Sequence, residues 1–426
     1  KKDVFIPAGR FIHKKFRIEG VTVRGLGDLS ILHAPNPKDA QITLWGKNSV
    51  IRDLKSTANT IARDPLWCDN IRAEQADSFL IQNVTIDGCD GAGIMLYIAF
   101  NGKVLNNRVS NSLSDGIHTM GGSRNIIIAG NTVRHCGDDH IAVVSYDTTE
   151  KEIVKNILVQ DNDVADQIWG RGMSVVGGMN VTFRRNRINR CSAAGFIVAT
   201  EASYTTGRVE NILIEENEIL NSNYLHPETG HSGIMVSADN QNIRNVLFRN
   251  NKLSNTPGQG IRLEGSAIPA NIAFVNTTMS NITGTAFVLT TGSNIYCSGT
   301  TKDGLAITPP CNGVMNYTVT GSSLTYQSPT TNESNKKISK DYVRLFTSQN
   351  PFTSGTIINC ALEKSSLVNL FIYDINGRLV SKVFSGMQHK GTKEYFWNVS
   401  NINAGVFIVR LQTVEQSISM RINLVK

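Results

Sequence analysis

Ile128-Ala129-Gly130-Asn131-Thr132-Val133 is one copy of a pattern that recurs along this chain, in which a central Asn lies between apolar residues. The other copies run over residues 104–109, 159–164, 183–188, 214–219 and 248–253, with a looser copy around Asn83. Their asparagines are about 24 to 34 residues apart, a spacing typical of stacked repeats, because one repeat cannot bury its apolar face alone.

Each repeat contains two or three short β-rich runs separated by Asn, Gly or Ser, which leaves no room for a long helix. The recurrent Asn tolerates left-handed backbone and can hydrogen-bond to its counterpart in the next turn. Leucine-rich repeats are excluded because their Leu-spaced consensus is absent, and helical solenoids because the 3.6-residue period is absent. The sequence therefore predicts an all-β protein whose main part is a right-handed parallel β-helix.

The composition argues against a nucleic-acid partner. The net charge is +7, but nine basic and four acidic residues fall after position 341, so residues 1–341 carry only +2. A basic face is the usual mark of nucleic-acid binding, and the larger part of the chain lacks the charge for one. We expect a monomer without nucleic acid and without a transmembrane segment, since no apolar run reaches membrane-spanning length.

The seven cysteines do not form a disulfide framework in a chain of 426 residues. Cys297 and Cys311 close a short loop and are the pair we expect to be bonded. Cys89, Cys136 and Cys191 follow the repeat at similar positions and are expected to be buried as small hydrophobic residues. No Cys and His pattern indicates zinc, and the sequence predicts no metal site or cofactor.

The period stops near residue 326. We predict a β-helix domain over residues 1–326, a polar linker over 327–341, and a small all-β sandwich over 342–426. The start of the chain supports the first assignment, because Val4-Phe5-Ile6-Pro7-Ala8-Gly9 resembles the opening turn of pectin-lyase-like β-helices.

The last 85 residues resemble the C-terminal sorting domain of the type IX secretion system of Bacteroidetes. The resemblance lies in Asn350-Pro351-Phe352, in residues 373–378 (Tyr-Asp-Ile-Asn-Gly-Arg), in residues 403–407 (Asn-Ala-Gly-Val-Phe) and in the terminal Val-Lys. It implies that the secretion machinery is a partner, and that the protein is secreted or held at the outer-membrane surface.

Three polar stretches lie on consecutive repeats: residues 114–118 (Ser-Asp-Gly-Ile-His), 136–140 (Cys-Gly-Asp-Asp-His) and 169–173 (Trp-Gly-Arg-Gly-Met). Each leads into a similar strand, so Asp115, Asp139 and Arg171 are expected at one recurring position. Neighbouring strands are about 4.8 Å apart, so carboxylates one coil apart perturb each other's pKa. Such a pair can supply a proton donor beside a base.

These stretches resemble the motifs of polygalacturonase-type glycoside hydrolases. The Asn-Thr-Asp motif of that family matches Leu113-Ser114-Asp115, its Asp-Asp motif matches Gly137-Asp138-Asp139, and its Gly-His-Gly-x-Ser motif matches residues 170–174. The resemblance implies an inverting hydrolase in which Asp138 protonates the leaving oxygen while Asp115 and Asp139 hold the nucleophilic water.

Two departures bear on the substrate. Arg171 replaces the family's histidine and is expected to pair with a carboxylate or a substrate anion, and Ile197-Val198-Ala199 replaces the Arg-Ile-Lys that grips a uronate. A neutral, methylated or differently charged glycan is therefore expected. The side chains expected to bind this polysaccharide are His118, Trp169, Arg171, Glu201, Tyr204, His231, Arg262 and Glu264.

Two alternatives use the same residues. The acids and Arg171 also resemble a calcium-dependent pectate-type lyase, in which Asp115, Asp138 and Asp139 would bind calcium and Arg171 would be the base. Alginate epimerases share this scaffold, but their Asp-Pro-His motif is absent. The second alternative is a surface glycan-binding protein without catalysis.

Overall fold

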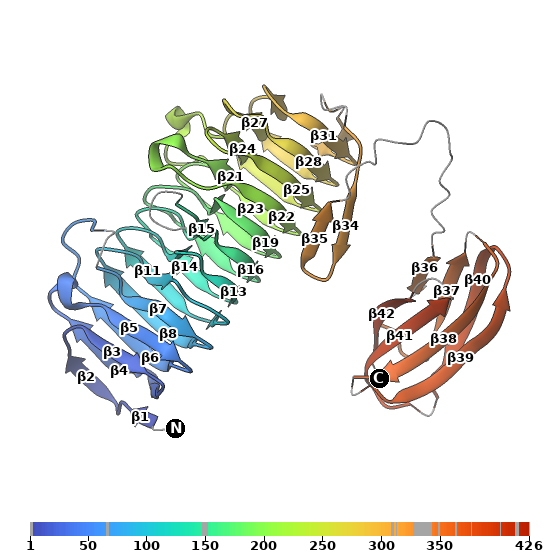
Figure 1. Cartoon of the computed structure of the whole chain (residues 1–426), viewed down its shortest axis with the longest axis horizontal. Helices are drawn as coiled ribbons and strands as arrows, with labels where there is room; N and C mark the ends of the chain where they lie inside the picture. Colours follow the sequence, from blue (N-terminus) through green and yellow to red (C-terminus); the bar gives the residue numbers. More distant parts are fainter. Residues whose placement is uncertain are drawn as a thin grey trace. The chain divides into compact units, whose positions relative to one another are not determined.

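The structure is a computed structural model that describes residues 3–64, 68–146, 152–307, 311, 313–326, 343–347, 350–362, 364–375, 377–400, 402–413 and 417–425. The chain divides into two compact units, Lys1–Pro329 and Thr330–Lys426 (Figure 1). The boundaries expected from the sequence, 1–326 and 342–426, stay a prediction, and the expected linker at 327–341 lies outside the described residues.

The first unit is a stack of coils, and each coil contributes one strand to an eleven-stranded parallel sheet (Figure 1). In chain order these strands are β3 (Phe16–Glu19), β5 (Ile42–Lys47), β7 (Ile71–Asp77), β9 (Ile94–Tyr97), β12 (Ile117–Met120), β15 (Ile141–Val144), β18 (Met173–Val176), β21 (Phe196–Thr200), β24 (Ile234–Ala238), β27 (Ile261–Glu264) and β30 (Phe287–Leu289). Ile117 pairs with Ile141, and Ile141 with Met173. The residues two positions earlier, Asp115, Asp139 and Arg171, are therefore in register, as the repeat predicted.

The other strands of the coils belong to a 22-stranded sheet. They are β1 (Asp3–Phe5), β2 (Gly9–Ile12), β4 (Thr22–Ala34), β6 (Val50–Ala58), β8 (Leu80–Cys89), β10 (Lys103–Leu105), β11 (Arg108–Ser112), β13 (Arg124–Ala129), β14 (Thr132–Arg134), β16 (Lys155–Gln160), β17 (Asp163–Ala165), β19 (Gly178–Arg184), β20 (Arg187–Asn189), β22 (Val209–Glu215), β23 (Glu218–Leu220), β25 (Ile243–Arg249), β26 (Lys252–Thr256), β28 (Ala270–Val275), β29 (Thr278–Ile282), β31 (Ser293–Ser298), β32 (Thr301–Lys302) and β33 (Leu305–Ala306). The long strand β8 pairs with both β10 and β11, so this sheet supplies two sides of the coil.

Apolar side chains from all sides of the coil meet inside the stack. Ile117, Ile141, Met173 and Phe196, which alternation predicts to point inward, are completely buried in this core. Alternation along a strand then directs the next residue outward, so the sheet presents a second set of side chains on its outer face. The core thus fixes which residues line the face that carries the acids.

A buried column of asparagines links the coils. The side chain of Asn131 donates to Asn162, Asn162 to Asn186, and Asn186 to Asn217, each with Nδ2–Oδ1 distances of 2.9 Å. Asn107 and Asn251 extend this inner ladder at its two ends. The prediction that the recurrent Asn residues stack is confirmed.

Two details of the predicted ladder are wrong. Asn83 does not belong to it, because the backbone N–H of Val84 is the group that bonds to Asn107, and Asn83 instead donates to Asp53 on the surface. The left-handed backbone also belongs to a different set, which includes Asn125, Asn156 and Asn180 with φ between 55° and 58°. These residues bond to one another as an outer ladder. The two sets differ because the exposed corner of the coil requires a residue that tolerates φ > 0, whereas the inner Asn provides hydrogen bonds to buried amide groups.

The last coils are tied by the predicted disulfide between Cys297 and Cys311. The strands β34 (Tyr317–Thr320) and β35 (Ser323–Tyr326) then form an antiparallel hairpin. Leu324 of this hairpin is buried against Leu213, Leu247 and Ala273 on the outside of the coils. Cys89, Cys136 and Cys191 are buried, as the sequence predicted.

The second unit consists of two antiparallel sheets around its own core. One sheet contains β36 (Val343–Thr347), β37 (Gly355–Leu362) and β40 (Gly391–Asn398), and the other contains β38 (Ser366–Asp374), β39 (Leu379–Gln388), β41 (Gly405–Thr413) and β42 (Ser417–Leu424). Phe352 from the first sorting motif is 1% exposed and packs edge-on against Trp397. The predicted small β-sandwich is confirmed.

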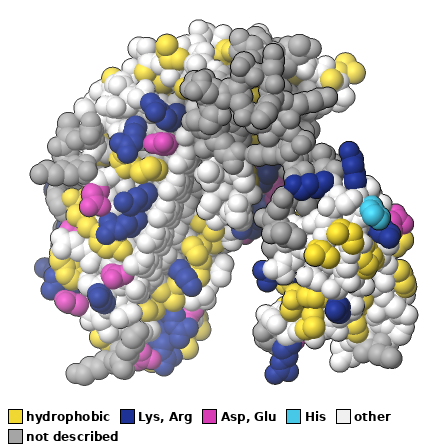
Figure 2. Space-filling view, turned by 45° about the vertical axis from the view of Figure 1, so that its right-hand side comes forward, with side chains coloured by type: hydrophobic (Ala, Val, Ile, Leu, Met, Phe, Trp, Pro, Cys, Tyr) yellow, Lys and Arg dark blue, Asp and Glu magenta, His cyan; other side chains and the backbone are white. Residues whose placement is uncertain are grey.

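Basic and acidic side chains alternate over the visible face of the first unit (Figure 2). Several arginines of the first unit pair with acids of a neighbouring coil, for example Arg185 with Asp161 and Arg124 with Glu152. Among the described residues, no helix is long and apolar enough to cross a membrane.

Candidate active site

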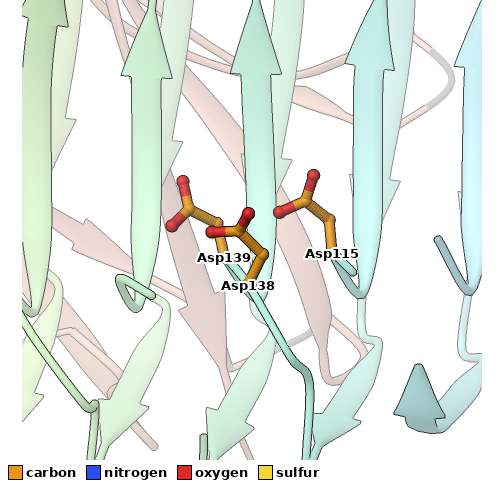
Figure 3. Close-up of side chains that lie close together, drawn as sticks. All are labelled: Asp115, Asp138 and Asp139. Atoms are coloured by element: carbon orange, nitrogen blue, oxygen red, sulfur yellow. The ribbon is translucent and has the colours of Figure 1, made fainter. Parts of the chain in front are cut away.

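The acids lie where the chain turns into two neighbouring strands. Asp115 precedes β12, and Asp138 and Asp139 precede β15, with their carboxylates grouped on one side (Figure 3). One carboxylate oxygen from each lies within 4.8 Å of the others. The stacking of the strands causes this meeting, since the backbone N–H of Gly116 donates to the carbonyl of Asp139 at 2.9 Å.

Asp139 is buried and ionised. Its carboxylate accepts hydrogen bonds from Nε, Nη2 and the backbone N–H of Arg171, at 2.8, 3.0 and 2.8 Å. Burial alone would raise the pKa of Asp139, but the charge and hydrogen bonds of Arg171 outweigh it and hold the pKa below its ordinary value. Asp139 is therefore negatively charged at neutral pH.

Asp138 has the opposite electrostatic environment. Burial, followed by the nearby charges of Asp115 and Asp139, raises the pKa of Asp138 to about 7, although Arg63 and Arg171 act against this rise. Its side chain is 26% exposed, whereas that of Asp139 is 3% exposed. Asp138 is therefore both accessible to solvent and able to donate a proton near neutral pH.

Asp115 forms a pair with His118, the first outward residue of β12. His118 Nδ1 bonds to Asp115 Oδ2, and both side chains are at least nine-tenths buried. Burial would lower the pKa of His118, but the charge of Asp115 outweighs it and raises the pKa. Nε2 of His118 is buried without a hydrogen-bond partner.

Arg171 links the acids to the next coils. Its Nη1 donates to Glu201 at 2.6 Å, so two carboxylates share this cation. Burial lowers the pKa of Arg171, but Asp139 and Glu201 raise it well above its ordinary value. Arg171 was expected to pair with a carboxylate or with a substrate anion, and its two partners are the carboxylates of Asp139 and Glu201.

The remaining predicted binding residues lie on two insertions that lengthen the repeat, residues 201–208 and 225–231, and on a following coil. Glu201 precedes the 3-10 turn η2 (Ala202–Tyr204), whose last residue, Tyr204, is 65% exposed. Arg262 and Glu264, both on β27, form an ion pair with each other. His231 is partly buried, and burial followed by the charges of Arg171 and Arg262 lowers its pKa, so it is neutral at pH 7.

Trp169 lies one residue before Gly170, at the edge of the acid cluster. Its ring is 46% exposed and packs edge-on against His226, with centroids 4.6 Å apart. His226 precedes the 3-10 turn η3 (Pro227–Thr229) and bonds to Glu228 at 2.7 Å. The ring of Trp169 is therefore half-exposed, and the residue after it, Gly170, lies against the backbone of Asp138.

Two residues that the motifs did not indicate also contact the site. Arg63 reaches Asp138 from a segment 75 residues earlier and forms an ion pair with it. Gln167 Nε2 donates to the carbonyls of Asp138 and Arg171, at 2.5 and 2.6 Å, and is 2% exposed. Gln167 carries no repeat signal, and Arg63 lies next to the break in the period at residues 64–69.

The outer face of the sheet beside the acids is apolar. Ala142, Val144, Val176, Ile197 and Met235 form a separate buried cluster there, against which Tyr146 packs. Ile197 is the first residue of the triplet that replaces the uronate-gripping motif. The floor beside the acids therefore carries no cation at that position.

The comparisons with known proteins agree with this architecture. The family described as right handed beta helix region matches residues 69–224 and 170–301, and the family described as secretion system C-terminal sorting domain matches residues 350–425. No curated protein matches the chain in sequence. The sorting match confirms that the protein is exported, to be secreted or attached at the cell surface.

Similar solved structures include the catalytic domain of a GH87 α-1,3-glucanase with one aspartate replaced by alanine, in complex with tetrasaccharides. It is 17% identical, covers 70% of this chain and 65% of its own, and has a TM-score of 0.57. The catalytic unit of the GH87 α-1,3-glucanase from Streptomyces thermodiastaticus strain HF3-3 and the Agl-KA catalytic domain are also 17% identical, each covering 70% of this chain and 63% of its own, with TM-scores of 0.54 and 0.57. The matched region spans less than two thirds of the length of these chains, and at this identity the likeness concerns the fold.

Proposed function

The chain belongs to the right-handed beta helix family, and on that premise we propose that it is an exported glycoside hydrolase that cleaves a polysaccharide with inversion. The observation that carries the proposal is the contrast between two adjoining carboxyl groups, one held in an ion pair with Arg171 and buried, the other more exposed. Asp138 has a pKa of about 7, and Asp139 beside it has a lowered pKa. Acid and base assignments follow from such separated environments.

In the proposed reaction Asp138 donates its proton to the glycosidic oxygen as the bond from that oxygen to the anomeric carbon breaks. Asp115 and Asp139 hold a water molecule, whose oxygen bonds to the anomeric carbon while its proton passes to a carboxylate. Asp115 is better suited to accept this proton, because the oxygens of Asp139 are occupied by Arg171. His118 stabilises Asp115 and keeps it oriented.

We propose a neutral glycan as the substrate. Each arginine near the acids has a protein partner: Arg63 pairs with Asp138, Arg171 with Asp139 and Glu201, and Arg262 with Glu264. An anionic sugar would have to compete with these carboxylates for each cation. The α-1,3-glucanases of the same fold act on such a neutral glycan, which supports including α-1,3-glucan among the test substrates.

The remaining predicted contacts extend this proposal. The exposed ring of Trp169 is proposed to stack on a sugar. Tyr204, Glu201 and His231 lie on insertions beside the acids and are proposed to contact the same chain of sugars.

A calcium-dependent lyase is the second candidate, favoured by the three carboxylates within 4.8 Å, an oxygen donor set that suits calcium. Asp139 and Asp138 already have cationic partners, however, which a calcium ion would displace or repel. Arg171 is also poorly suited as the base. A base has to be deprotonated before it can accept a proton, and the raised pKa of Arg171 keeps it protonated. These two points support hydrolysis.

The test is product analysis on pectins, alginate, sulfated galactans, arabinogalactans and α-1,3-glucan, with and without a calcium chelator. Hydrolysis gives new reducing ends without an unsaturated chromophore, and Asp138→Asn should lower the rate by about 10²–10⁴-fold. A chromophore that disappears with chelator would establish the lyase, and binding without either product would establish a glycan-binding protein.

The anomer of the first product is a separate test of the stereochemistry. Carboxyl groups of inverting enzymes are typically about 6.5–9.5 Å apart and those of retaining enzymes about 5 Å. The carboxylate oxygens here lie within 4.8 Å of one another, on the retaining side of this division, whereas the motifs resemble those of inverting enzymes. The anomer therefore decides between the two. Proton NMR should show the inverted anomer first, and a retained anomer would make Asp115 or Asp139 a nucleophile instead.

A further inference from the structure

Arg63 belongs to a short segment between β6 and β7 that is anchored on Asp90. The backbone N–H groups of Ile61 and Ala62 donate to the carboxylate of Asp90 at 2.8 and 3.3 Å, and the N–H of Asp64 donates to its carbonyl at 2.8 Å. Asp90 is 4% exposed. These bonds fix the backbone around Arg63, while its side chain remains 48% exposed.

The contact of Arg63 occupies one of the two carboxylate oxygens of Asp138, whose side chain is 26% exposed. Nη2 of Arg63 bonds to Oδ2 of Asp138. The other oxygen, Oδ1, faces the backbone at Gly170, where an added Cβ would lie 2.9 Å from it. Gly170 therefore crowds Oδ1 and Arg63 covers Oδ2, so Arg63 has to move before Oδ2 can bond to a glycosidic oxygen.

We propose that Arg63 is a blocking residue for Asp138: its guanidinium covers Oδ2 in the empty cleft and leaves when a glycan enters. Asp138 then takes up its proton with the substrate in place. This inference rests on the proposed function, in which Asp138 is the general acid. Arg63 acts through Asp138 and is a positioning residue for the reaction.

Space for this displacement exists beside the segment. A cavity of about 740 Å³ is lined by Asn59, Thr60, Ile61, Leu113 and Ile168, among others. Leu113 lies two residues before Asp115, and Ile168 lies three residues before Arg171, so the cavity borders the turns that precede and follow the turn of Asp138. Ile61, two residues before Arg63, also lines it, and the proposal places the displaced side chain here.

The test compares the pH dependence of the free and the substrate-bound enzyme in the wild type, Arg63→Ala and Arg63→Lys. The profile of kcat/KM reports the free enzyme, and that of kcat reports the complex. Removing the positive charge should move the alkaline limb of kcat/KM upward by about 1 pH unit. The limb of kcat should stay in place, because Arg63 has already left Asp138 in the complex.

Arg63→Lys keeps the charge and should retain most of the wild-type profile. Arg185→Ala is the matched control, since Arg185 is a similarly exposed arginine that pairs with Asp161 away from the site. Neither limb should move in this control. A kcat limb that moves as far as the kcat/KM limb would overturn the inference, because Arg63 would then still contact Asp138 in the complex.

A carbon-13 NMR titration of the aspartates separates this inference from the proposed function. The signal of Asp138 is assigned through Asp138→Asn, and no substrate is needed. The pKa of Asp138 should be higher in Arg63→Ala than in the wild type, and equal values would overturn the inference whatever the activity. Absence of glycan cleavage together with a raised pKa would refute the proposed function alone.

Discussion

At the scale of single residues, the protonation state of Asp138 should set the pH range of activity. A general acid must carry its proton, so kcat/KM should fall about tenfold per pH unit above about 7, the pKa of Asp138. Asp139 remains charged well below this pH because Arg171 lowers its pKa, so the acidic limb should lie below neutrality. A pH–rate profile on the cleaved polysaccharide measures both limbs, and a rate that rises through pH 7 would contradict the assignment of Asp138 as the acid.

Gly170 is a second residue on which the site depends. Its φ is +93°, and an added Cβ would lie 2.6 Å from the carbonyl carbon of Asp138 and 2.8 Å from its Cα. Gly170→Ala should therefore displace Asp138 and lower kcat/KM by at least about tenfold, in addition to a backbone cost of about 1–2 kcal/mol.

Gly258→Ala separates these two effects. Gly258 has a similar φ of +87°, and an added Cβ there would meet nothing within 4 Å. This variant should lose comparable stability in thermal unfolding and keep its activity. Equal activity loss in both variants would show that the backbone conformation, and not the contact with Asp138, is responsible.

Sequence reasoning located the three acids because their strands share one register. Each Asp precedes a similar apolar strand, and a strand repeat places such residues at one position on successive coils. The motifs did not indicate Arg63, because 75 residues separate Arg63 from Asp138 and the segment around Arg63 does not follow the repeat. Glu201 was identified as a binding residue, but its bond to Arg171 depends on how an insertion folds, which the spacing of residues does not determine.

At the scale of elements, the inner asparagine ladder should stabilise the stack more than the outer one. Asn186 accepts from the backbone N–H and Nδ2 of Asn162 and donates to the carbonyl of Val159, all within the core. Asn186→Ala leaves these groups without partners, at about 1–3 kcal/mol for each buried group. Denaturant unfolding should show this loss as a lower midpoint.

The outer ladder provides the control. Asn180 is exposed, has φ 55°, and bonds to Asn156 and Asn211. Asn180→Gly keeps the left-handed backbone available and removes only exposed bonds, so the free energy of unfolding should fall by less than about 0.5 kcal/mol. Similar losses in both variants would mean that burial of the inner amides is not the source of the inner ladder's stability.

The sequence pattern contains both sets of Asn but does not distinguish them, because the geometry of the corner decides which Asn side chain points outward.

At the scale of the whole molecule, the two units have separate cores. The first core consists of residues between Ile18 and Ile295, and the second of residues between Phe352 and Leu424. All three acids and both insertions belong to the first unit, and the sorting match belongs to the second. Catalysis and export are therefore expected to be separable by truncation.

Removal of residues 342–426 should abolish export and leave activity intact. The β-helix keeps its complete core, so the purified truncated chain should unfold at nearly the same temperature and retain the same kcat/KM as the full chain. In a host with a type IX secretion system, immunoblots should find the truncated chain retained within the cell envelope instead of in the medium or on the surface.

The full chain with Asp138→Asn is the matched control, because it should be exported normally without activity. Truncated protein in the medium at the level of the full chain would show that export depends on the β-helix, and a large loss of activity on truncation would show that the second unit contributes to the site.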